Sequence, residues 1–98
     1  MVRKIIWSKK AIQQRKDILA YWSERNQSDA YSKKLNTLFR NEVNILAKYP
    51  NIGRMSDIEN VRIRVVKNYL LFYQEKNKEL QILSIWDSRQ NPEKMKAY

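Results

Sequence analysis

The sequence predicts an α+β domain in which an antiparallel helical hairpin packs on one face of a mainly antiparallel β-sheet. Residues 9–49 carry apolar side chains at intervals of three and four, which is typical of amphipathic helices. Residues 61–86 contain three short apolar segments separated by turn-forming residues, which is typical of β-strands. A chain of 98 residues is long enough for one two-layer core, so residues 1–98 are expected to form a single domain.

The N-terminal segment predicts a strand followed directly by a helix. Residues 4–7 are apolar and β-prone, but the pattern does not place this strand in the sheet. Ser8 can cap a helix over residues 9–25, because its hydroxyl can accept a hydrogen bond from the first turn.

The second helix has the clearest apolar pattern in the chain. It is expected to begin after a cap at Ser28 and to end before Pro50, and Glu42 interrupts its core-facing stripe. The stripe consists of Tyr31, Leu35, Leu38, Phe39, Ile45, Leu46 and Tyr49. A link of about two residues between the helices requires an antiparallel hairpin. Pro50 and Gly53 then start a loop that is expected to reach residue 60.

Three strands are expected over residues 61–66, 69–74 and 80–86, with tight turns at residues 67–68 and 76–78. The middle strand is apolar on both faces, as in a central strand that is covered on both sides. In the first strand, Val61, Ile63 and Val65 alternate with Arg62 and Arg64, so the arginines are expected to point away from the core. The predicted core therefore combines the helix stripe with Ile63, Val65, Leu71 and Ile82. Residues 93–98 are expected to add a short helical turn.

The composition restricts the possible functions. Twenty basic against ten acidic residues give a net charge of +10, which attracts polyanions without specifying one. Cysteine and histidine are both absent, so disulfides, thiolate metal sites and imidazole-based catalysis are excluded. We expect a cytoplasmic protein, because no segment suggests a membrane span or a secretory signal. We expect no cofactor and no metal, because the sequence has no Gly-rich phosphate loop and no metal-ligand cluster.

The strongest candidate for function is a basic surface on the predicted sheet. Arg62 and Arg64 would lie about 7 Å apart on one pleat face, a spacing that suits successive phosphates or carboxylates. Arg54, Lys67 and Arg89 can converge near them. The partner could be RNA, DNA or an acidic protein, and an ordinary solvated sheet face is the alternative. Tyr69, Tyr73 and Trp86 could stack on bases, or could serve as core or partner contacts.

Residues 61–92 resemble the RelE/ParE superfamily of bacterial type II toxin–antitoxin toxins. The resemblance rests on the Val-Arg-Ile-Arg strand at 61–64, the Asn-Tyr-Leu-Leu-Phe-Tyr strand at 68–73, the Leu-Gln-Ile-Leu-Ser-Ile strand at 80–85, and the Trp-Asp-Ser-Arg-Gln-Asn-Pro ending at 86–92. The loop at residues 49–54 and the order of the elements also agree.

This resemblance implies a small basic toxin that an acidic antitoxin neutralises in a hetero-oligomeric complex. One branch of the superfamily cuts mRNA on the ribosome, and the other poisons DNA gyrase. Arg62, Arg64 and Arg89 match the basic positions of the RNA-cleaving branch. That branch also has an arginine in the middle strand, where this chain has Leu70 or Leu71, and a histidine or tyrosine near its end, where this chain has only Tyr98.

We therefore expect a growth-inhibiting toxin, and poor candidates for proton transfer favour the gyrase-directed branch. The expected target-binding residues are Arg54, Arg62, Arg64, Lys67, Tyr73 and Arg89, and the expected antitoxin contacts are Tyr69, Trp86 and Gln90. The first alternative is a ribosome-dependent mRNA endonuclease in which Arg62, Arg64 and Arg89 stabilise the phosphate, while Tyr98 or a loop carboxylate transfers protons. The second is a non-toxic nucleic-acid-binding module.

Overall fold

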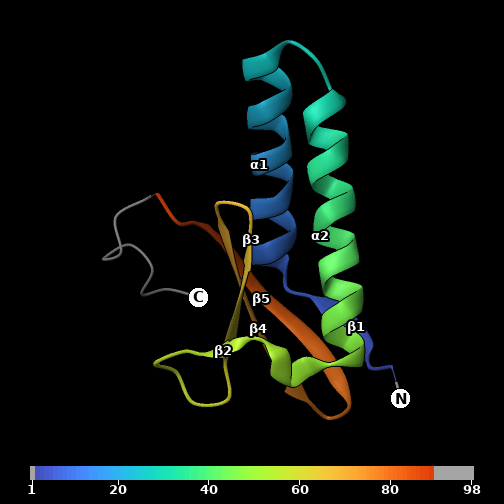
Figure 1. The fold of residues 1–98 in the computed structure, drawn as a ribbon, viewed down its shortest axis with the longest axis vertical. Coiled ribbons are helices and arrows are strands. Elements are labelled where there is room, and N and C mark those ends of the chain that lie inside the picture. Colours follow the sequence, from blue (N-terminus) through green and yellow to red (C-terminus); the bar gives the residue numbers. More distant parts are fainter. Residues whose placement is uncertain (1, 90–98) are drawn as a thin grey trace.

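Two long helices lie antiparallel on one face of a five-stranded sheet and extend well beyond it (Figure 1). The computed structural model describes residues 2–89 of the chain. In chain order the elements are β1 (Lys4–Trp7), α1 (Lys9–Asn26), α2 (Ala30–Lys48), the short 3-10 helix η1 (Pro50–Ile52), β2 (Arg54–Met55), β3 (Arg62–Val66), β4 (Tyr69–Lys76) and β5 (Glu79–Asp87). The predicted fold class is confirmed, whereas the helical turn expected over residues 93–98 lies outside the described residues.

The sheet has the order β1-β5-β4-β3-β2, so the unplaced first strand lies at one edge. β1 runs parallel to β5, from Lys4 opposite Glu79 to Trp7 opposite Ile82, and every other pair is antiparallel. A parallel pair needs a long connection between its strands, which the helical hairpin and the other strands provide.

The helix boundaries follow local capping chemistry. Ser8 caps α1 as expected, because its hydroxyl accepts a 3.0 Å hydrogen bond from the amide of Ala11. The same hydroxyl donates to the carbonyl of Leu83 at 2.7 Å, which fastens the start of α1 to β5. The prediction for α2 is off by one residue: Asp29 occupies the N-cap position, and Ser28 instead accepts a bond from the amide of Ala30.

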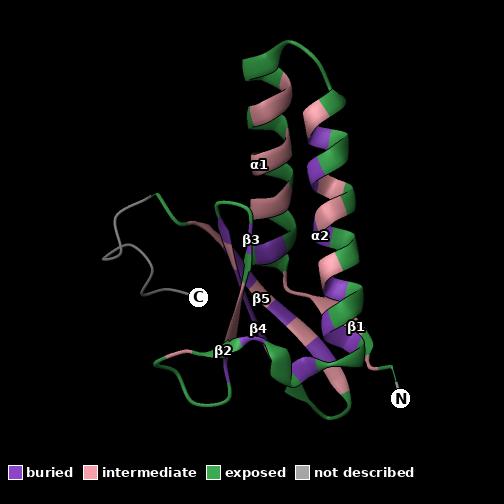
Figure 2. Ribbon diagram, in the orientation of Figure 1, coloured by how far each residue is buried: buried purple, intermediate pink, exposed green. Residues whose placement is uncertain are grey.

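The core lies between α2, the lower part of α1 and the sheet (Figure 2). Leu35, Phe39 and Leu46 are buried as expected, but Ile45 and Tyr49 are 40% and 61% exposed. The predicted stripe is too wide at its end, because Tyr49 lies beyond the last helical residue. The other buried positions of α2 are Ser32, Val43 and Ala47, which the predicted stripe does not include. No helix within residues 2–89 has the length and apolar content needed to cross a membrane.

β4 is the central strand, as predicted, and Leu71, Phe72 and Tyr73 are all at most 2% exposed. The turn after it has positive φ angles at Asn77 and Lys78, which is the conformation of a two-residue hairpin turn. β2 was missed: this two-residue strand pairs with β3 inside the segment that was expected to be a loop, and is too short to show an alternating pattern.

Candidate functional site

The arginines of β3 face the helices and not the opposite side of the sheet. Paired residues on neighbouring antiparallel strands share a face, and Arg62 and Arg64 pair with the core residues Tyr73 and Leu71. Ile63 is only half-buried and Val65 is 52% exposed. The predicted assignment of the two faces, with Ile63 and Val65 in the core, is therefore wrong.

Both guanidinium groups bind their own chain. Arg62 Nη1 donates to the carbonyl oxygens of Gly53 at 2.8 Å and Asn51 at 3.3 Å. Arg64 Nε donates to Glu42 Oε2 of α2 at 2.9 Å, and this ion pair is only partly exposed. Glu42 interrupts the apolar stripe of α2 because it meets this arginine. The predicted open pair of adjacent cations is thus contradicted by the intramolecular bonds of both residues.

Tyr73 is fully buried, so in this structure its side chain offers no surface for the predicted contact with a target. Its hydroxyl donates to the carbonyl of Pro50 at 2.7 Å and accepts from the amide of Gly53 at 2.9 Å. Burial raises the pKa of the Tyr73 phenol, which makes it a poor proton acceptor near neutral pH. Tyr73 therefore holds the Pro50–Gly53 segment in place, and that segment supplies the carbonyls that bind Arg62.

The remaining basic residues do not converge, contrary to expectation. Arg54 is opposite Ile63, which places it on the face opposite Arg62. Lys67 lies in the β3–β4 turn, at the far end of β3 from Arg62. Arg89 follows β5 at this same end, since Asp87 is opposite Tyr69. The sheet thus carries separate basic positions at its two ends.

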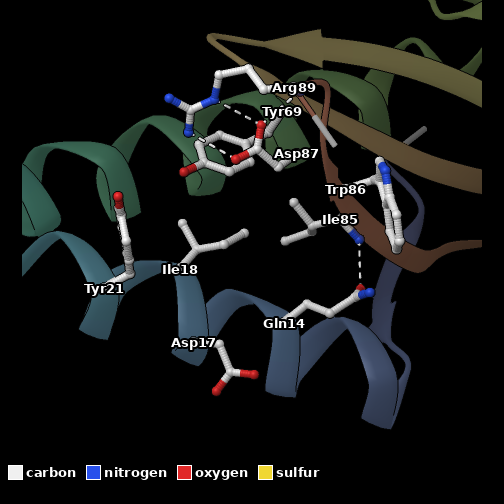
Figure 3. A pocket seen from close by; sticks show the side chains of 9 residues that line it. All are labelled: Gln14, Asp17, Ile18, Tyr21, Tyr69, Ile85, Trp86, Asp87 and Arg89. Atoms are coloured by element: carbon white, nitrogen blue, oxygen red, sulfur yellow. Dashed lines mark hydrogen bonds and ion pairs between the residues drawn. The ribbon is translucent and has the colours of Figure 1, made fainter. Parts of the chain in front are cut away.

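A cleft of about 460 Å³ lies between α1 and the end of β5 (Figure 3). We call it the Tyr69 cleft. It is lined by Gln14, Asp17, Ile18, Tyr21, Tyr69, Ile85, Trp86, Asp87 and Arg89. Two predicted antitoxin contacts, Tyr69 and Trp86, thus belong to one site. The ring of Trp86, however, lies on the other side of β5 from Ile85 (Figure 3). The third, Gln90, and the candidate catalytic residue Tyr98 lie outside the described residues.

One wall of the cleft is an edge of β5 that no described strand covers. β1 pairs with β5 only as far as Ile82, so residues 83–87 have no strand neighbour on that side among residues 2–89. A side chain pairs with part of this edge: Gln14 Oε1 accepts a 2.7 Å hydrogen bond from the backbone amide of Ile85. Gln14, Asp17 and Tyr21 were not predicted, although Tyr21 is an aromatic residue on a helix face that is otherwise left to solvent.

Several polar groups of the cleft are paired, whereas the indole Nε1 of Trp86 is buried without a hydrogen-bond partner among residues 2–89. The Tyr69 hydroxyl accepts a 2.8 Å hydrogen bond from Trp22 Nε1, and burial raises the pKa of this phenol. Arg89 binds both carboxylate oxygens of Asp87, at 2.8 and 3.0 Å, and these bonds lower the pKa of Asp87. The pair in turn raises the pKa of Arg89. Near neutral pH Tyr69, Asp87 and Arg89 are therefore a neutral phenol, an anion and a cation, and none of these three is a ready proton acceptor.

Replacing Asp87 by asparagine is expected to remove stability at neutral pH but not in acid. Because the folded-state pKa of Asp87 lies below its unfolded value, its contribution is complete above about pH 4 and disappears as pH falls through the folded pKa. Thermal unfolding of wild type and Asp87→Asn between pH 7 and pH 2 measures this difference. A gap in melting temperature that stays constant below pH 4 would contradict the assigned ion pair.

A cleft with both apolar and polar walls and an uncovered strand edge is suited to binding a protein segment. The helical hairpin on a five-stranded sheet is the RelE/ParE-like fold. Residues 5–92 match the family described as "ParE toxin of type II toxin-antitoxin system, parDE", and the chain therefore belongs to the ParE toxin family. A toxin of such a system has an antitoxin as its protein partner.

Solved structures agree with this fold. The structure described as "Chromosomal ParDE TA system from P. aeruginosa" is 21% identical, covers 88% of this chain and 96% of its own, and has a TM-score of 0.76. The isolated E. coli RelE toxin is 11% identical, covers 97% of this chain and 94% of its own, and has a TM-score of 0.61. At these identities the likeness shows the fold alone. No individually curated protein matches the chain.

Proposed function

We propose that this ParE-family toxin inhibits growth by binding and poisoning DNA gyrase, and that it does not cleave RNA. The observation that carries the proposal is the state of the two β3 arginines. Arg64 is paired with Glu42, and Arg62 is bound to the carbonyls of Gly53 and Asn51. Guanidinium groups that must stabilise a phosphate in the transition state would first have to give up these bonds.

Proton transfer argues in the same direction. RNA cleavage needs a base and an acid whose pKa values lie near the working pH. Tyr69 and Tyr73 are buried phenols with raised pKa values, and the pKa of Asp87 is lowered by Arg89. A nuclease would depend instead on Tyr98 or on the loop carboxylates Asp57 and Glu59. The proposed target contacts are accordingly the exposed cations at positions 54, 67 and 89, and none of these roles requires chemistry.

We further propose that the Tyr69 cleft receives a segment of the acidic antitoxin. Ile18, which is partly buried, offers apolar contact in its interior, and Arg89 at the cleft can bind a carboxylate of the partner. The net charge of +10 favours an acidic partner and speeds association with it. Trp86, whose ring lies on the other side of β5, would extend the contact beyond the cleft, and Gln90 stays a proposed antitoxin contact.

Replacing Tyr21 by alanine is expected to weaken antitoxin binding by about 30-fold, because exposed aromatic side chains in a cleft are frequent hot spots. Tyr21 is 50% exposed, so the fold should lose little stability. Tyr49→Ala is the matched control, since Tyr49 is 61% exposed but lies at the end of α2, outside the cleft. Calorimetric titration with the antitoxin measures both; equal losses for the two variants would rule out the cleft as the docking site.

The test of toxicity is expression of the chain without its antitoxin, followed by two readouts in the same culture. We expect a DNA-damage response without cleavage of mRNA on translating ribosomes. The alternative, a ribosome-dependent endonuclease, is favoured by one observation: Arg62 lines a small pocket of about 170 Å³ beside Asn60 and Glu75. That alternative predicts mRNA cleavage that is lost in Arg62→Ala and Arg64→Ala. Normal growth would remove both toxin mechanisms and favour a non-toxic nucleic-acid-binding module.

A further inference from the structure

The positive charge of the chain is concentrated on the helical hairpin. α1 carries five basic and two acidic side chains, and α2 carries four basic and one acidic. This distribution places a net charge of +6 on the hairpin, out of +10 for the whole chain. The single acidic residue of α2, Glu42, is occupied by Arg64 of the sheet. The Tyr69 cleft uses only one side of α1, so most of this basic surface has no role in the function proposed above.

One part of this surface is organised around an aromatic ring. The guanidinium carbon of Arg15 lies over the ring of Trp7, 4.9 Å from its centroid. Trp7, Ile12, Arg15 and Lys16 line a small pocket of about 180 Å³. Stacking on an indole face orients the planar guanidinium and leaves the N–H donors at its edge available to an anion. We call Trp7, Arg15, Lys16 and Arg40 the Arg15 cluster.

Arg40 lies on α2, the helix that packs beside α1, and supplies a second guanidinium on the hairpin. Burial lowers the pKa of Arg15 and the positive charge of Arg40 lowers it further, so Arg40 is counted with this site. Both groups stay charged, because arginine is not deprotonated in proteins. The ion pairs of residues 2–89 involve Arg3, Arg64 and Arg89, so within this part of the chain no carboxylate neutralises Arg15, Lys16 or Arg40. Clustered cations without an acidic partner are stabilised when an anion binds between them.

We propose that the Arg15 cluster binds backbone phosphates of duplex DNA. Its pocket is smaller than the usual 300–1,000 Å³ of a small-molecule site, so it suits a phosphate group better than a whole nucleotide. Ile12, which is 43% exposed, could serve an acidic protein as an apolar contact, so such a protein is the alternative occupant that the test must exclude. The choice of DNA rests on the proposed action on gyrase, whereas phosphate recognition rests on the cluster itself.

The test is binding of the purified full chain to a fluorescent 20-base-pair duplex, measured by anisotropy over a salt series. The variant Arg15→Gln/Arg40→Gln is compared with Lys33→Gln/Lys34→Gln, which removes the same charge about 10 Å away along α2. We expect the first variant to lose about tenfold or more in affinity at low salt, and its salt slope to fall by about 2. The control should lose less than about threefold. Equal losses of affinity in both variants would overturn the proposal, because they would indicate general electrostatic attraction to DNA and not a specific phosphate site.

Two further outcomes distinguish a DNA phosphate site from a site for an acidic protein, and from the proposed action on gyrase. If the Arg15 cluster variant binds a poly-glutamate peptide or the antitoxin less tightly but binds DNA normally, the site belongs to an acidic protein and the proposal is overturned. If the DNA result is as expected but gyrase is unaffected by the wild-type chain, the phosphate site stands and the gyrase target falls. Arg40→Gln alone removes one exposed side chain. If the double variant unfolds, Arg40→Gln alone replaces it in the test. The single variant should lower the salt slope of DNA binding by about 1.

Discussion

Replacing Gly53 by alanine is expected to destabilise the fold by about 3 kcal/mol, although this glycine has backbone angles that any residue can adopt (φ −70°, ψ 154°). The cause is lack of space. A Cβ atom at position 53 would overlap the Tyr73 hydroxyl and lie 2.8 Å from its ring carbon Cε1. Tyr73 is buried in the core and cannot move aside. The substitution would therefore break the bonds from its hydroxyl to Pro50 and Gly53, and would shift the carbonyl that binds Arg62.

A double-mutant cycle sharpens this prediction. Tyr73→Phe removes the oxygen that the new methyl group would meet, so Gly53→Ala should cost about 1 kcal/mol less in that background. Ile52→Ala is the control from the same segment, and should cost about 0.5 kcal/mol, because Ile52 is 46% exposed. Urea unfolding of the four proteins and the control measures these free energies. A cost below about 1 kcal/mol for Gly53→Ala, or strict additivity with Tyr73→Phe, would contradict the close packing described here.

Replacing Phe39 by alanine is expected to cost about 4 kcal/mol, a large part of the stability of a small domain. Phe39 is fully buried, and its ring packs edge-on against Tyr69, with centroids 5.7 Å apart. Its loss would leave a cavity beneath Tyr69, which lines the Tyr69 cleft. We therefore expect weaker antitoxin binding as well as lower stability, even at temperatures where the variant is fully folded.

The control for Phe39 is Ile45→Ala on the same helix, where the side chain is 40% exposed and lies outside the cleft. It should cost less than about 1 kcal/mol and leave antitoxin affinity unchanged. Phe39→Leu, which refills most of the volume, should recover more than half of the lost stability. Denaturant unfolding and calorimetric titration give the two quantities. If Phe39→Ala lowered stability but not antitoxin affinity, antitoxin binding at the cleft would not depend on the packing of Phe39 beneath Tyr69.

The elements of this fold could be predicted because each has a local signal. Ser8 caps α1, the apolar period identifies α2, and turn residues separate β3, β4 and β5. The face of β3 could not be predicted, because Val65 and Val66 are adjacent valines and alternation alone does not say which face meets the helices. The register of β3 against β4 decides it, together with the pairing of Arg64 with Glu42, which is 22 residues away in the chain.

The site was less predictable than the fold for the same reason. Tyr69 and Trp86 were identified from the strands that carry them, but the opposite wall of the cleft comes from α1. Gln14 bonds to Ile85, 71 residues further along the chain, and no local pattern announces such a contact. Likewise Tyr73 looked available on a strand next to a basic segment, yet its hydroxyl is bound by the Pro50–Gly53 segment. Tertiary contacts, and not residue type, separate the proposed binding positions from the structural ones.

The central claim is that the β3 arginines serve the structure and the toxin acts on gyrase without cleaving RNA. The most direct measurement incubates the purified full chain with gyrase and supercoiled DNA, and in parallel with ribosomes translating a defined mRNA. We predict that cleaved DNA accumulates only when gyrase is present, while the mRNA stays intact. Intact DNA together with an mRNA cut at the ribosome, abolished by Arg62→Ala, would contradict the account.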